Sequence, residues 1–347
     1  VYVFKTHDDF PYYHLTYTLN LSENSFIVGT GNFSHGFRTF SSLFYYHSLL
    51  YLPLIKYYLF FIGPFFILIF TNFIIISEIK RKIELNNINF IYFFLLLSFI
   101  FINVVFYRIG EHGTDRSAQI LLLLIFSIFF EIFYFEKNEK NIYLKISILL
   151  ILIFLASSMK AIYYLYLILI PFIFIKKKFI KKFLIKKNFL LISLLSLSLF
   201  LNLITNYFNT GCFLYPAKQT CIGSKEWSIP KKEVKIMALH YEWWSKAGGG
   251  PGYENEMSRE VYVKNFIWVK NWIERHFFNK VSDTLYGIIF MSILLYLVFR
   301  LSGIKQNNYY PNKYFLAYFL PLLFLIEWFL NHPAMRYGGY VLFAIPF

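Results

Sequence analysis

The stretch AQILLLLIFSIFFEIFYF, residues 118–135, decides the fold class, because it is almost wholly apolar and contains a single charged residue, Glu131. A helix needs about 20 predominantly apolar residues to cross the hydrocarbon core of a bilayer. Comparable runs recur along the chain, and a further run begins near residue 340. We expect spanning helices over residues 53–77, 89–107, 118–135, 142–157, 161–175, 188–207, 281–301 and 314–330, the fourth and fifth of them short.

The composition of the whole chain agrees with this interpretation. Of its 347 residues, 58% are hydrophobic, 23% are aromatic and only 15% are charged, whereas soluble domains average about 25% charged residues. These values exclude a soluble, disordered, collagen-like or disulfide-rich protein. The expected fold is therefore all-α, a single polytopic transmembrane domain over residues 1–347. Because the chain starts at Val1 and stops at Phe347 inside an apolar run, we expect it to be a fragment.

The basic residues predict the orientation of the chain in the membrane. The formal net charge is +15, but the basic residues gather at the ends of apolar runs, which argues against binding to nucleic acid. Cytoplasmic loops of membrane proteins carry an excess of Lys and Arg. The clusters comprise Lys80, Arg81, Lys82, Lys137, Lys140, Arg300, Lys305, Lys313 and the seven lysines of 176–187. The opposite, extracytoplasmic side then receives residues 1–52, 108–117, 208–280 and 331–339, which contain most of the acidic residues.

Two short extracytoplasmic segments contain candidate catalytic carboxylates. The first includes Asp8, Asp9 and His14, which can supply a general base or hold a divalent cation. The alternative is a polar helix cap where the chain leaves the membrane. The second segment contains Glu111, with Asp115 and Arg116 directly before the span at 118–135. Asp115 can also be the N-cap of that helix. His14, Glu111 and Arg116 are candidates for binding the substrate.

Two cations on the same side are candidates for binding phosphate. Arg336 can hold a phosphate through paired hydrogen bonds, and Lys160 lies in the turn between two short spans. The alternative for both is that the long side chain reaches the interface without binding substrate. Carboxylates and cations on one membrane face are expected for an enzyme with a lipid-linked phosphate donor, in which the cations hold the leaving phosphate.

The long loop 208–280 contains the remaining features. Cys212 and Cys221 are the only cysteines, and we expect them to form a structural disulfide. We expect amphipathic helices near 230–246 and 255–279, the second lying on the membrane surface, with a flexible glycine-rich tip at 247–253. Another segment, residues 32–42, combines aromatic residues with one Arg and fits an interfacial helix or an aromatic belt.

The order of these motifs resembles a known family. Asp8-Asp9 followed by Tyr13-His14, then Gly113-Thr114-Asp115-Arg116, then Tyr215-Pro216 and finally 333–337 are similar to motifs of the GT-C class of integral-membrane glycosyltransferases. More narrowly, the chain resembles the bacterial LIC_10190-type membrane proteins.

The resemblance implies a site and a reaction. It implies a catalytic carboxylate on Asp9 or Asp8, with Asp9 preferred, and an assisting carboxylate on Asp115 or Glu111. The implied donor is a polyprenyl-phosphate-linked sugar, used at the periplasmic face of the bacterial inner membrane. Members of the class differ in metal dependence, so a divalent cation, Mg²⁺ or Mn²⁺, on Asp9 and Asp115 is an open alternative.

Two other functions are open from the sequence. A lipid-linked polysaccharide polymerase or a flippase-like carrier also handles lipid phosphates at a membrane face. A polymerase is expected to use arginines of the extracytoplasmic loops, which are few here, and a carrier is expected to tolerate loss of Asp9. A purely structural membrane subunit is disfavoured because ionisable groups gather on one face.

Overall fold

The computed structural model describes residues 9–106, 113–135, 138–176, 186–222, 225–250, 252–301 and 315–345. The protein is mainly helical, and the strands found in these residues form a single two-stranded hairpin. The chain divides into two compact units, and each is described by itself. Unit 1 contains residues 1–74 and 102–234, and unit 2 contains residues 75–101 and 235–347.

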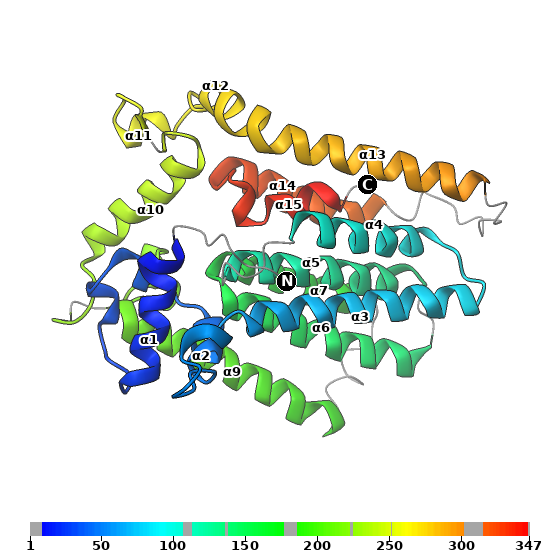
Figure 1. The fold of residues 1–347 in the computed structure, drawn as a ribbon, viewed down its shortest axis with the longest axis horizontal. Helices are drawn as coiled ribbons and strands as arrows, with labels where there is room; N and C mark the ends of the chain where they lie inside the picture. Colours follow the sequence, from blue (N-terminus) through cyan, green and yellow to red (C-terminus); the bar gives the residue numbers. More distant parts are fainter. Residues whose placement is uncertain are drawn as a thin grey trace. The chain divides into compact units, whose positions relative to one another are not determined.

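Unit 1 contains the N-terminal helices and a bundle of apolar helices. Its elements are η1 Phe10–His14, α1 Leu15–Glu23, η2 Thr30–Asn32, η3 His35–Arg38, α2 Ser42–Ser48, η4 Tyr57–Leu59, α5 Thr114–Phe130, η6 Glu131–Phe135, α6 Glu139–Met159, η7 Ala161–Ile168, α7 Leu169–Lys176, α9 Lys186–Thr210 and η8 Lys218–Thr220. In Figure 1, α5 runs alongside α6, against which it packs. The apolar part of α5 is 83% buried, so α5 is an interior helix of the bundle.

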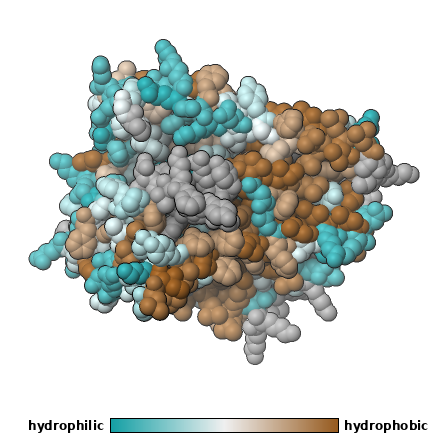
Figure 2. Space-filling view, in the orientation of Figure 1, coloured by the Kyte–Doolittle hydropathy of each residue, from teal (hydrophilic) through white to brown (hydrophobic). Residues whose placement is uncertain are grey.

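Unit 2 contains the long loop and the C-terminal helices. Its elements are α10 Lys231–Ser245, β1 Gly249–Gly250, β2 Tyr253–Glu254, α11 Arg259–Tyr262, α12 Val269–Trp272, η9 Ile273–Val281, α13 Ser282–Leu301, α14 Phe315–Asn331, η11 Met335–Tyr337 and α15 Gly339–Ala344. Three helices contribute residues to both units: α3 Ile62–Glu84, α4 Phe90–Val105 and α10, whose first four residues, 231–234, belong to unit 1. Figure 2 shows hydrophobic side chains over α13 and hydrophilic ones over α10 and α11.

Among the described residues, five helices are long and apolar enough to cross a membrane. They cover Tyr57–Glu84, Thr114–Phe135, Asn141–Met159, Asn188–Thr210 and Val269–Leu301. Three shorter apolar helices, Phe90–Val105, Ala161–Phe174 and Phe319–Asn331, lie where the sequence predicts the other spans. The all-α prediction is therefore confirmed, and several helices suit a membrane protein.

The structure corrects two expectations for the loops and adds detail to a third. The helix expected over 255–279 is wrong in its bounds: α11 ends at Tyr262, and a new helix begins at Val269 and continues to Leu301. The expected glycine-rich tip at 247–253 includes β1 and the first residue of β2, which pair as a short antiparallel hairpin. Residues 32–42 form no single helix, because η2 ends at Asn32 and η3 covers only His35–Arg38.

Candidate functional site

An ion pair at one end of the unit 1 bundle joins two of the predicted site residues. The Lys160 ammonium donates a hydrogen bond to a carboxylate oxygen of Asp115. Asp115 lies in the first turn of α5, whereas Lys160 directly follows the end of α6. The two meet because α5 begins where the antiparallel α6 ends. Each side chain is 19% exposed, so the pair is largely desolvated but still reachable.

Hydrogen bonds around this pair hold the backbone at Asp115 and the turn before Lys160 in place. The Tyr163 hydroxyl donates to the backbone carbonyl of Asp115 over 3.4 Å. Two residues before Lys160, the Ser158 hydroxyl lies 2.7 Å from that of Ser42. The Asn202 side chain of α9 donates to the Ser158 carbonyl over 3.4 Å and accepts from the Tyr164 hydroxyl over 2.7 Å. Polar contacts from α2, α6, η7 and α9 therefore hold the turn that carries Lys160.

The alternative interpretation of Asp115 as a helix cap is wrong. The N-cap of α5 is Gly113, and Asp115 lies two positions further on. A negative charge in the first turn is still favourable, because the unpaired backbone N–H groups there carry partial positive charge. Arg116 is half-buried beside it in the same turn. The Asp115 carboxylate contacts the Lys160 ammonium and does not cap the helix.

The N-terminal candidates have different environments. Asp9 occupies the N-cap position of η1, and its side chain makes no capping hydrogen bond to that helix. Its catalytic role stays a prediction. His14 is buried, with its ring centroid 4.4 Å from that of Tyr13 and 5.2 Å from that of Phe44. His14 therefore packs against aromatic rings, and its predicted contact with substrate stays a prediction.

The sequence did not reveal the role of Arg38. Its Nη2 lies 2.6 Å from a carboxylate oxygen of Glu233, and its Nε donates to the Gly31 carbonyl over 3.0 Å. Burial lowers the pKa of the Arg38 guanidinium, but Tyr215 and Glu233 more than offset that effect and raise the pKa. Arg38 therefore stays charged and fastens the N-terminal segment to the start of α10. Its partner is 195 residues away, so no local pattern could have identified it.

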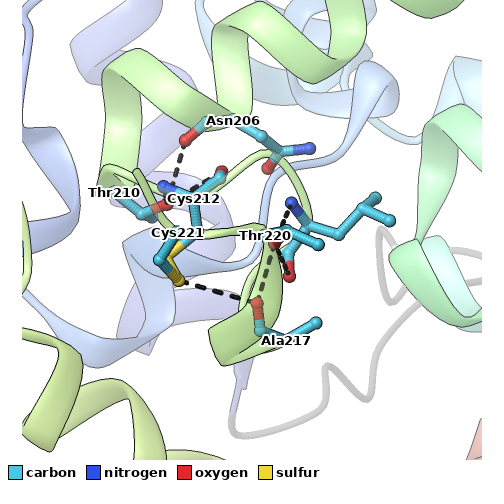
Figure 3. Close-up of a disulfide and its surroundings, with 7 residues drawn as sticks. Asn206, Thr210, Cys212, Ala217, Thr220 and Cys221 are labelled. Atoms are coloured by element: carbon cyan, nitrogen blue, oxygen red, sulfur yellow. Dashed lines mark hydrogen bonds between the residues drawn. A yellow bond between two sulfur atoms is a disulfide. The ribbon is translucent and has the colours of Figure 1, made fainter. Parts of the chain in front are cut away.

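The disulfide lies next to this junction. The structure joins Cys212 and Cys221, as expected, and Figure 3 shows the hydrogen bonds around them. The Thr210 hydroxyl donates to the Asn206 carbonyl over 2.9 Å and accepts from the Cys212 N–H over 3.2 Å. The Thr220 hydroxyl donates to the Ala217 carbonyl over 2.8 Å. The bridge and these bonds close a compact loop after α9, which suits a structural staple.

Arg336 belongs to unit 2 and is described within it. Its guanidinium carbon lies 5.2 Å from the ring centroid of Trp244 and 5.3 Å from that of Tyr337. Such cation–π contacts orient an Arg without consuming all of its hydrogen-bond donors. The short helix η11 that carries Arg336 also buries Met335.

Two candidates, Asp8 and Glu111, lie outside the described residues. Within the described ranges, no three His, Cys, Asp or Glu side chains gather in a way that could hold a metal ion. Asp115 is already paired with an ammonium group, which opposes a second cation at the same carboxylate. The described residues do not fit a metal centre, and no metal-dependent step is derived from them.

The arrangement in unit 1 can hold a phosphate near a carboxylate. An ammonium fixed by one carboxylate is oriented before a ligand arrives, and an incoming phosphate can share it without moving the backbone. The pair lies at the end of apolar helices, where a lipid phosphate would lie in a bilayer.

Comparison with known proteins gives a family. No curated protein and no solved structure matches the chain. One family, described as Domain of unknown function (DUF8201), matches residues 4–343, which is nearly the whole chain. The chain therefore belongs to the DUF8201 family.

Proposed function

We propose that this protein is a membrane glycosyltransferase that moves a sugar from a polyprenyl-phosphate donor to an acceptor on the extracytoplasmic face. The observation that carries the proposal is the Asp115–Lys160 pair at the end of the buried helix α5. The order of the sequence motifs and the GT-C resemblance support it. In a bacterium, the membrane would be the inner membrane and the site would face the periplasm.

In this proposal Lys160 binds the donor phosphate and Asp115 positions Lys160. The acceptor oxygen forms a bond to the anomeric carbon of the sugar while the bond from that carbon to the phosphate oxygen breaks. Asp9 takes the proton of the acceptor hydroxyl as general base. The electron pair leaves with the phosphate, whose added negative charge Lys160 stabilises. The products are a glycosylated acceptor and polyprenyl phosphate.

The experiment follows the donor in proteoliposomes. Undecaprenyl phosphate carrying radiolabelled glucose, galactose or mannose is supplied with total envelope lipids as acceptor. The proteins compared are the wild type, Asp9→Asn, Asp115→Asn and, as a matched control, Asp283→Asn, which removes an exposed carboxylate from the first turn of α13. We expect label to leave the donor with the wild type and Asp283→Asn only.

Other outcomes decide against parts of the proposal. If turnover survives loss of both Asp9 and Asp115, neither carboxylate acts in the reaction. If the folded wild type moves donor between leaflets but never consumes it, the carrier function replaces the transferase.

A further inference from the structure

The loop between α2 and α3 presents an apolar tip to the surroundings of unit 1. Leu54 is 96% exposed and Leu49 is 78% exposed, and Leu52, Ile55 and Tyr58 are exposed as well. From residue 49 to residue 61 the only charged side chain is that of Lys56. A surface of this kind is unusual in water, where large contiguous apolar patches mark interaction sites.

The tip has a defined shape. Residues Leu52 and Lys56 form an isolated antiparallel bridge, and the Lys56 N–H donates to the Leu52 carbonyl over 2.6 Å. At its base, Phe60 is fully buried and its ring stacks on that of His47, with 6.0 Å between centroids. The apolar side chains are therefore held outward by an anchored turn.

The loop leads directly into an apolar helix long enough to cross a membrane. The apolar segment that includes α3 begins at Tyr57, and the rings of Tyr57 and Tyr58 stack with 4.7 Å between centroids. Tyr is enriched at membrane–water interfaces, where its ring is apolar and its hydroxyl is wet. Lys56, at the neck of the turn, can reach lipid phosphates from there.

We propose that the turn 49–58 inserts into the leaflet at the Tyr57 end of α3, with Leu54 among the acyl chains and Lys56 at the phosphates. The occupant of this surface is thus lipid, because the turn is continuous with the helix that enters the same bilayer. The insertion fixes the depth of the N-terminal segment, which α2 joins to the turn.

Site-directed spin labelling tests this depth. The two native cysteines are joined in the disulfide and no free cysteine is present, so Leu54→Cys and Leu49→Cys each provide a single free thiol. Controls are Phe73→Cys on the exposed side of α3, and Glu256→Cys in an exposed loop. A nitroxide on each thiol is measured in phosphatidylethanolamine–phosphatidylglycerol vesicles against oxygen, which enters lipid, and a water-soluble nickel chelate.

We expect the Leu54 label to be several-fold more accessible to oxygen than to the nickel chelate, as at Phe73, with the opposite order at Glu256. A nickel accessibility at Leu54 equal to that at Glu256 would overturn the proposal, since the turn would lie in water. A label shielded from both reagents at Leu54 and Leu49 would also overturn it, because protein would then cover the turn. Both residues are exposed, so their replacement should leave folding intact.

Discussion

Asp115 and Lys160 are 45 residues apart in the sequence, yet their side chains form a largely desolvated pair. Removing one charge leaves the other in a site with little water, which costs more than the pair itself contributes. Removing both charges avoids this cost. The two residues should therefore behave as a coupled unit in stability as well as in chemistry.

A double-mutant cycle measures this coupling. Asp115→Asn and Lys160→Met should each lower the free energy of unfolding in detergent, and the double variant should recover part of the loss, with a coupling of about 0.5–3 kcal/mol. The control pair is Lys80 and Glu84, an exposed pair 3.8 Å apart on α3, whose coupling should be near zero. A coupling at Asp115–Lys160 no larger than that of the control would contradict the observed contact.

Tyr45 gives a prediction on pH. Burial raises the pKa of Tyr45 to about 12, an effect that the neighbouring Tyr17 partly reduces, whereas a tyrosine in the unfolded chain has a pKa of about 10. Below pH 10 the phenol is neutral in both states and its contribution to stability is complete. Between pH 10 and 12 the unfolded state ionises first, so stability falls by up to about 1.4 kcal/mol per pH unit.

The matching measurement compares unfolding of the wild type and Tyr45→Phe over that pH range. The variant should lose less stability than the wild type between pH 10 and 12. The exposed neighbour Tyr46 supplies the control Tyr46→Phe. Equal slopes for the wild type and Tyr45→Phe would show that Tyr45 does not ionise differently in the two states.

At the scale of the elements, the loop closed by Cys212 and Cys221 should stabilise the segment after α9. A disulfide restricts the unfolded chain, and for a separation of 9 residues loop-closure entropy gives about 2–3 kcal/mol. The variant Cys212→Ser/Cys221→Ser should therefore unfold at a lower temperature. Reductant should lower the midpoint of the wild type by a similar amount and leave the variant unchanged. A variant as stable as the oxidised wild type would show that the disulfide does not stabilise the protein.

The β1–β2 hairpin gives a matched pair of glycine variants. A Cβ at Gly248 would overlap the ring of Trp243, whereas a Cβ at Gly250 has no neighbouring atom within 4 Å. Gly248→Ala should destabilise the protein by about 1–3 kcal/mol, the usual cost of overpacking. Gly250→Ala should leave the thermal midpoint almost unchanged. If both variants melt alike, the hairpin does not pack on Trp243.

The sequence predicted the helices better than their contacts. Apolar runs mark the length of chain that can lie in a membrane, which is why the expected spans coincide with helices. Hydropathy does not show where a helix begins, however. The helix through 281–301 begins at Val269, but its first part contains the polar residues Glu274, Arg275 and Lys280, so the apolar run alone did not reveal this start. Asp115 was chosen as a candidate because its short turn is rich in charge, and the structure shows that it contacts Lys160. The Arg38–Glu233 pair depends on tertiary packing and has no local signal.

At the scale of the whole molecule, we propose that the protein is an enzyme of the extracytoplasmic membrane face. The charge clusters of the sequence predict this orientation, and the five long apolar helices of the described residues are long enough to cross a membrane. In this proposal, Lys160 binds the donor phosphate during sugar transfer.

The most direct measurement is kcat/KM for transfer of radiolabelled sugar from undecaprenyl phosphate in proteoliposomes, comparing wild type, Lys160→Met and Asp115→Asn/Lys160→Met. The double variant keeps the site free of an unpaired charge, so it separates folding from chemistry. We predict turnover by the wild type and a loss of about 100-fold or more in both variants, as for removal of a group that stabilises a transition state. Equal turnover by wild type and the double variant would contradict the claim.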